Sequence, residues 1–79
     1  MRVLVTGMGG ELGTRVAQLL EERDEVSEIA GFDIWPPRRR LRRSEFHRIE
    51  PHDQVRITEF VHDFAPEIVI HYGVYEPDS

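Results

Sequence analysis

Cysteine and lysine are both missing from the 79 residues of this sequence. Without cysteine the chain cannot form disulfides, zinc-thiolate sites or thiol nucleophiles, and this composition fits the reducing cytoplasm, where we expect the protein. The longest apolar runs, Val3–Val5 and Ile68–Ile70, are far shorter than the roughly 18 residues that cross a bilayer. Thr6 and Gly7 also interrupt any signal-peptide core. We therefore expect neither a membrane segment nor a secretory leader.

Composition and charge are those of a small globular domain. Apolar residues make up 39% of the chain and charged residues 32%, a balance that a disordered chain does not have. The net charge of -5 argues against a general nucleic-acid binder. The histidines show no i, i+4 pair and have no cysteine partners, so we expect no metal site. These histidines are His47, His52, His62 and His71.

Short runs of branched apolar residues predict four strands, each bounded by glycine, proline or charged residues. The expected strands are Arg2–Val5, Glu28–Asp33, Glu45–Ile49 and Glu67–Tyr72. Strands that alternate with helices favour right-handed crossovers and a parallel sheet. We therefore predict one α/β doubly wound domain over residues 1–79, with strand order 3-2-1-4 and two main helices.

The two helices are predicted from apolar residues that recur at helical spacing. The first helix begins near Leu12, and its expected apolar face is Leu12, Val16, Leu19 and Leu20. Its end should fray over residues 21–25, because acidic side chains there oppose the helix dipole. The second helix begins after the capping residue Asp53 and ends before Pro66. Its expected apolar face is Val55, Phe60, Val61 and Phe64.

A glycine-rich turn carries the strongest functional signal. Glycines recur every three residues where the first strand turns into the first helix. Such a turn uses one glycine for unusual backbone angles, one for close approach to a pyrophosphate and one for tight helix packing. Amides at the start of the helix then bind phosphate. The candidate residues are Gly7, Gly9, Gly10, Glu11, Leu12 and Gly13.

Asp33 favours this interpretation over a purely structural glycine turn. It lies twenty positions beyond Gly13, at the end of the second strand. A carboxylate there can accept hydrogen bonds from both hydroxyls of an adenosine ribose, whereas the alternative is a solvated turn residue. Since a 2′-phosphate would meet the negative charge of Asp33, the sequence favours NAD over NADP.

These features together resemble the extended short-chain dehydrogenase/reductases, which include NAD-dependent epimerases and dehydratases. The resemblance rests on the Thr-Gly-x-x-Gly-x-x-Gly turn from Thr6 to Gly13, on Asp33, and on the segments Glu50–Asp53 and Pro66–His71. It covers essentially the whole chain, which corresponds to the first quarter to third of a typical member. The resemblance implies a partial Rossmann fold that binds NAD at the front of an enzyme acting on a sugar nucleotide.

The resemblance also implies further cofactor contacts. In the family, an aspartate after the third strand contacts the adenine amino group, and the next amide contacts the ring. Glu50 and Pro51 occupy these places here, and proline has no amide hydrogen to offer. The residues His71-Tyr72-Gly73-Val74 resemble the family's His-Leu-Ala-Ala, whose backbone passes close to the cofactor ribose and nicotinamide. Tyr72 and Gly73 are therefore added to the candidate site.

Catalytic residues are not assigned. Family members use a tyrosine with a lysine four residues later, and this chain contains no lysine, so neither Tyr72 nor Tyr75 can form that pair. The resemblance therefore implies cofactor binding without turnover by this chain alone. The alternative is a self-standing, non-catalytic module that senses a nucleotide or docks on a partner.

Two remaining features bear on partners. Half of the ten basic residues lie between Arg38 and Arg43, after Pro36 and Pro37, in a segment expected to be a loop. This cluster is open to interpretation as a solvated loop, a 2′-phosphate clamp or a nucleic-acid patch, in that order, because only Trp35 supplies a nearby aromatic ring. The fourth strand should form an apolar sheet edge, which favours self-association or a partner that completes the sheet.

Overall fold

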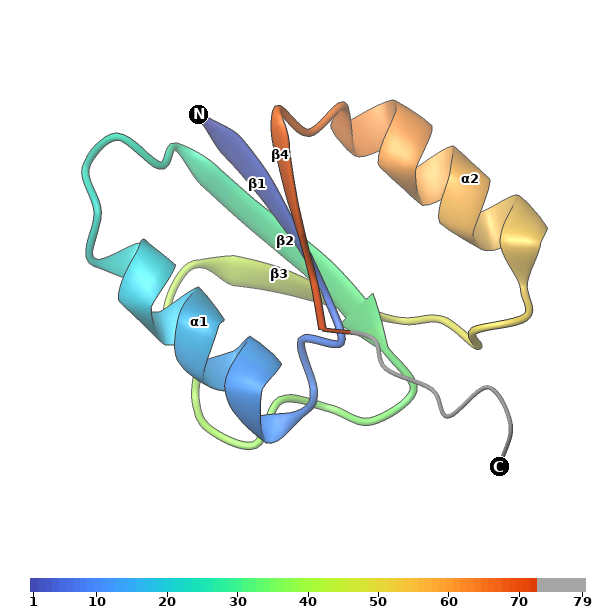
Figure 1. The fold of residues 1–79 in the computed structure, drawn as a ribbon, viewed down its shortest axis with the longest axis horizontal. Helices are drawn as coiled ribbons and strands as arrows, with labels where there is room; N and C mark the ends of the chain where they lie inside the picture. The colour runs from blue at the N-terminus through green and yellow to red at the C-terminus, as the bar shows by residue number, and fades with distance from the viewer. Residues whose placement is uncertain (73–79) are drawn as a thin grey trace.

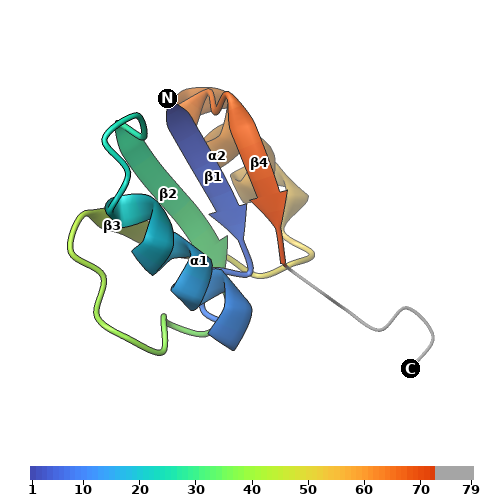
Figure 2. The same ribbon diagram turned by 60° about the vertical axis from the view of Figure 1, so that its left-hand side comes forward.

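The chain folds into a four-stranded parallel sheet with one helix on each face (Figures 1 and 2). This computed structural model describes residues 1–72. In chain order the elements are β1 (Arg2–Thr6), α1 (Glu11–Glu21), β2 (Glu28–Asp33), β3 (Ser44–Arg48), α2 (Gln54–Phe64) and β4 (Ile68–His71). The strand order is β3-β2-β1-β4, and every neighbouring pair is parallel. The predicted α/β fold and strand order are confirmed.

The bounds of β2 agree with the prediction, and the ends of the other strands differ from it by no more than one residue. β1 continues through Thr6, because this residue is in register with Phe32 of β2 and His71 of β4. β3 is shifted one residue toward the N-terminus, from Ser44 to Arg48. The central strand therefore carries its pairing to the point where the glycine turn begins.

The sheet is buried most completely around β1, whose side chains alternate between two apolar clusters. Val3 and Val5 point toward the α1 side and pack with Met8, Ala17, Val26 and Ile29. Leu4 points to the opposite side and packs with Ala30 and Phe64. Parallel strands that are covered on both faces have continuous runs of apolar residues in their sequence. For this reason the residues of β1 between Arg2 and Thr6 are all apolar.

The face that α1 presents to the sheet was predicted only in part, because Leu20 packs against the core and Val16 is half-buried, whereas Leu12 and Leu19 point outward. Leu12 and Leu19 are 64% and 57% exposed, and the residues of α1 that are buried are Gly13, Thr14, Ala17 and Glu21. The reason is the close approach of the helix to the glycine turn. A Cβ atom on Gly13 would lie 2.0 Å from the carbonyl oxygen of Gly7. Only a small residue fits at this approach, and Leu12 and Leu19 turn outward.

The face of α2 was predicted correctly except at Val55, which is 68% exposed. Ile57 lies on the inner side instead, since it shares the i, i+3, i+4, i+7 spacing with Phe60, Val61 and Phe64. The ring of Phe60 meets Phe32 of β2 edge to face, with centroids 5.7 Å apart. The predicted cap is confirmed, because the side chain of Asp53 accepts a hydrogen bond from the amide of Arg56 at 3.2 Å.

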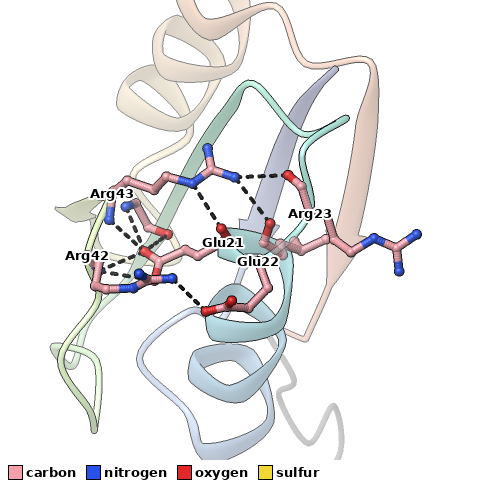
Figure 3. Close-up of polar contacts among 7 residues, drawn as sticks. Glu21, Glu22, Arg23, Arg42 and Arg43 are labelled. Carbon is pink, nitrogen blue, oxygen red and sulfur yellow. Dashed lines mark hydrogen bonds and ion pairs between the residues drawn. The ribbon is translucent and has the colours of Figure 1, made fainter.

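The segment from Ile34 to Arg43 is an ordered loop tied to α1, and Figure 3 shows its anchor, Glu21. The Glu21 side chain is 2% exposed and accepts hydrogen bonds from the amides of Arg42, Arg43 and Ser44 and from the Ser44 hydroxyl. The arginine cluster was predicted to be a solvated loop. At Arg42 and Arg43 this prediction does not hold, because the amides of both residues are bound by Glu21.

Arg43 also resolves the problem of an acidic helix end. Its guanidinium donates to the last carbonyls of α1 and to the turn that follows (Figure 3). The acceptors are the carbonyl oxygens of Leu20, Glu21, Arg23 and Ser27. A cation at this position complements the helix dipole, which the acidic residues of the sequence do not. Arg43 lies 22 positions after Glu21, so the charges near the helix end did not reveal this contact in the sequence.

Candidate nucleotide-binding site

A cleft of about 820 Å³ opens at the carboxyl ends of the strands. The chain runs from β1 outward to β2 and β3 and then returns past β1 to β4, so the direction of winding reverses beside β1. Open α/β sheets bind ligands at this kind of switch point, because the loops on either side diverge. Among the sequence candidates, the cleft is lined by Gly7, Gly10, Asp33, Pro51 and Tyr72.

Gly10 differs from the other glycines at the turn. Gly7 needs its positive φ of 72°, which other residues rarely adopt. Gly9 and Gly13 are needed because a Cβ atom would lie 1.8 Å from the carbonyl of Trp35 and 2.0 Å from that of Gly7, respectively. At Gly10 the nearest atom to a Cβ would be 3.5 Å away, which is ordinary contact. The fold thus has no need of glycine at position 10, and this glycine lines the cleft.

The start of α1 supplies backbone donors beside Gly10. This residue is the N-cap of α1, and no side chain accepts a hydrogen bond from the first turn. Amides at such a helix start, together with the helix dipole, favour a bound anion. Glu11 and Leu12 occupy that first turn, with exposed side chains that do not line the cleft, so they can contribute only through their amides.

Asp33 is held in place by two backbone amides. Its Oδ2 accepts a hydrogen bond from Gly9 at 3.0 Å, and its Oδ1 accepts one from Ile34 at 2.7 Å. A carboxylate has about four acceptor positions, so two remain for hydroxyl donors from a ligand. The side chain is therefore fixed in orientation at the cleft wall while keeping capacity to bind.

The two residues that follow β3 are placed differently from one another. Pro51 lines the cleft, whereas Glu50 does not. The Glu50 carboxylate is paired with Arg48 at 3.4 Å. The other residues that line the cleft, several of them on α2, were not predicted as site residues. They are Leu4, Thr6, Phe32, Ile34, Trp35, Ile49, Gln54, Ile57, Thr58, Val61, Val69 and His71. The available signal was the position of Ile34 and Trp35 directly after a strand-end acid.

At β4 the cleft is bounded by His71 and Tyr72. The ring of His71 shares a hydrogen bond with the hydroxyl of Thr6 through Nδ1, and the amide of Tyr72 donates to the carbonyl of Thr6 at 3.0 Å. These contacts fix the end of β4 against β1. Gly73 and Tyr75 lie outside the described residues.

No arginine in the described part of the chain lines the cleft. The amide of Arg38 donates to the hydroxyl of Thr14 at 3.1 Å, which holds this part of the loop against the first half of α1. Arg40 and Arg42 line a separate depression of about 370 Å³ beside the outer side of α1. This placement does not favour a 2′-phosphate clamp in the cleft.

Within residues 1–72, no helix is long and apolar enough to cross a membrane. The same residues contain no group of three or more side chains that could hold a metal ion.

Comparison with known proteins places this geometry in a family. The model of the NAD dependent epimerase/dehydratase family matches residues 3–78. Among solved structures, the chain is similar to the Bordetella bronchiseptica enzyme WbmH in complex with NAD+, with a TM-score of 0.78 and 26% identity. The match covers 95% of this chain and 26% of WbmH, so the chain spans about a quarter of that enzyme's length. No curated protein sequence matches. The chain belongs to the NAD dependent epimerase/dehydratase family.

Proposed function

We propose that the chain binds NAD in the cleft at the carboxyl ends of the strands. The pyrophosphate lies against Gly10 and the first amides of α1, and the adenosine ribose donates its hydroxyls to Asp33. The observation that carries this proposal is Gly10, a glycine at the cleft that the fold itself does not require. The similar enzyme WbmH was solved with NAD+, which supports the choice of ligand.

The matched pair Gly10→Val and Leu19→Ala tests the proposal. Gly10 has φ -79° and ψ 172°, an extended conformation that valine adopts without strain. Its side chain would nevertheless stand between the amides and a pyrophosphate. Leu19 is on the same helix, 57% exposed and not part of the cleft lining. We expect calorimetry to show loss of NAD binding for Gly10→Val alone, with cooperative unfolding retained by both variants. Parental affinity in a folded Gly10→Val protein would refute the phosphate role.

NAD is the preferred cofactor in this proposal, and NADP is disfavoured. A 2′-phosphate would approach the Asp33 carboxylate, and the cleft wall offers no guanidinium to offset the repulsion within the described residues. Competition of NAD and NADP for the same cleft in calorimetry would measure the preference. Tighter binding of NADP would overturn the assignment of Asp33 to the ribose.

At the level of the whole protein, we propose that residues 1–79 are the cofactor-binding front part of an enzyme that acts on sugar nucleotides. The chain as given is proposed to be catalytically incomplete, because it has no lysine to lower the pKa of a catalytic tyrosine. Incubation with NAD and nucleoside diphosphate sugars should therefore give no epimerised or dehydrated product by NMR. Product formation would contradict this part of the proposal.

The absence of lysine equally favours a second candidate, a non-catalytic module that senses a nucleotide or docks on a partner. The two candidates differ in what the DNA downstream of the codon for Ser79 encodes. An in-frame continuation with a Tyr-x-x-x-Lys motif supports the enzyme, and its absence supports the module.

We also propose that the sheet is completed at β4, by a second copy or by a partner strand. The opposite edge, β3, carries Glu45, His47 and Arg48, and charged side chains protect an edge from pairing. At β4, by contrast, Ile68 and Val69 are 42% and 54% exposed. Light scattering coupled to gel filtration should show association that Val69→Lys reduces. A parent chain that stays monomeric at all concentrations would contradict pairing between copies.

A further inference from the structure

The position of the nucleotide base follows from the proposed ribose contact. A base is attached directly to its ribose, so a ribose bound by Asp33 places its base against the nearest part of the cleft wall. That wall is formed by the residues after β2 and β3, namely Ile34, Trp35, Ile49 and Pro51. Its side chains are apolar, and they offer flat or branched surfaces to a purine ring.

Trp35 is the most prominent of these residues. It is 68% exposed, although it belongs to a loop that is fixed on both sides. On one side, its carbonyl oxygen is so close to Gly9 that a Cβ there would lie 1.8 Å away. On the other side, the rigid Pro36-Pro37 pair leads to Arg38, whose amide is bound by Thr14. The backbone therefore holds an exposed indole at the cleft before any ligand arrives.

The same wall lacks two polar groups that could form hydrogen bonds with the edge of the base, an amide hydrogen at position 51 and the carboxylate of Glu50. Pro51 has no amide hydrogen, and Glu50 is turned to Arg48 and does not line the cleft. The polar side chains that α2 adds to the cleft are Gln54 and Thr58. The Gln54 carboxamide and the Thr58 hydroxyl can each donate and accept, so by rotating they can satisfy either an amino or a carbonyl group on the base.

We propose that Trp35 holds the base of the bound dinucleotide by stacking, and that the cleft does not distinguish the amino group of adenine from the carbonyl of hypoxanthine. Stacking tolerates a change of base, because every base has a π face. Selectivity for an amino group requires a fixed acceptor, and the Glu50 carboxylate is paired with Arg48 and does not line the cleft. This inference rests on the proposed binding of NAD.

The first experiment titrates NAD and nicotinamide hypoxanthine dinucleotide into the protein, by calorimetry and by fluorescence. Trp35 is the single tryptophan, so its emission reports the base subsite directly. We expect both ligands to quench the emission, with dissociation constants within about threefold of each other. Hypoxanthine dinucleotide that binds more than about tenfold more weakly overturns the inference while leaving NAD binding intact. Binding without quenching overturns the stacking role, and no binding of either ligand refutes both proposals.

The second experiment compares Trp35→Leu with Trp35→Phe by calorimetry. Leucine keeps apolar area but loses the aromatic face, so NAD should bind about tenfold more weakly, and phenylalanine should restore most of the affinity. Because the indole is 68% exposed, we expect both variants to unfold at the temperature of the parent. Leu19→Ala, outside the cleft, is the control. Glu50→Gln tests whether Glu50 takes part in holding the base, and because Glu50 is paired with Arg48 we expect its replacement to leave the affinity unchanged. Parental affinity in Trp35→Leu, or about tenfold weaker binding in Glu50→Gln, would show that the base is read differently.

Discussion

Replacement of Glu21 by glutamine should weaken the fold more than any other single charge removal on α1. The carboxylate is 2% exposed and accepts from three amides and one hydroxyl of the loop (Figure 3). Glutamine has the same shape, but it loses the negative charge, and with its oxygen kept toward Arg43 and Ser44 its amide nitrogen would still face the amide donor of Arg42. A hydrogen bond to a charged group is worth about 1.5 to 3 kcal/mol, and an opposed buried donor costs about 1 to 3 kcal/mol. We therefore expect Glu21→Gln to lower the free energy of unfolding by about 2 to 4 kcal/mol.

The same contacts set a pH dependence. Burial raises the pKa of Glu21, but the hydrogen bonds from Arg43, Arg42 and Ser44 outweigh it and leave the pKa below its ordinary value of 4.5. A carboxyl group whose pKa is lowered by folding stabilises the native state above the unfolded-state pKa, and this contribution is lost as the pH falls through the folded-state pKa. Stability of the parent should therefore decline below about pH 4.5, and Glu21→Gln should lack this part of the decline.

Urea unfolding at about pH 7 and about pH 3.5 measures both effects, with Glu22→Gln as the control. Glu22 is the next residue, its side chain is 67% exposed, and within residues 1–72 it is paired with the Arg42 side chain alone. Its replacement should change stability by less than about 0.5 kcal/mol at either pH. If Glu21→Gln matched Glu22→Gln in stability and in pH dependence, Glu21 could not be the anchor of the loop.

Three further outcomes are expected. Asp33→Ala should weaken NAD by about 1 to 2 kcal/mol in calorimetry and narrow its preference over NADP, and unchanged affinity would exclude the ribose contact. Gly13→Ala should lower the melting temperature by several degrees, because its Cβ would lie 2.0 Å from the Gly7 carbonyl; a parental melting temperature would mean that α1 can shift freely. Asp53→Ala should cost about 1 kcal/mol in urea unfolding through loss of the Arg56 cap, and no change would mean the cap is unimportant.

The sheet and the glycine turn could be predicted because their signals are local in the sequence. Parallel strands buried on both faces require unbroken apolar runs, and Val3–Val5 is such a run. The turn needs glycine for reasons of backbone geometry, and the structure bears these out at Gly7 and Gly13, whereas the close approach of Trp35 to Gly9 had no signal in the sequence. Asp33 was identified at the end of β2, where it lines the cleft. Its role toward the ribose stays a prediction.

The helix faces could not be predicted fully, because apolar spacing does not reveal how close a helix comes to its neighbour. Leu12 and Leu19 have the right spacing for a buried face, yet both are exposed. Val55 likewise has the spacing of a buried face and is 68% exposed. In α1 the decisive contact is Gly13 against Gly7, a backbone approach that leaves no room for leucine. Periodicity therefore predicted the helices and most of the face that α2 buries, but only part of the face that α1 buries.

Thr14 and Glu21 are two polar residues of α1 that hold the loop, and apolar spacing alone does not indicate that they are buried. They are seven positions apart, so they lie on one face of α1 about two turns from each other, and both are buried. Buried polar side chains need partners, and a loop without a ladder of its own has amides that need acceptors. Thr14 accepts the amide of Arg38, and Glu21 accepts those of Arg42 and Arg43. Because these bonds replace the ladder or helix that the loop lacks, α1 fixes the segment that carries the proposed base-stacking residue to the cleft wall.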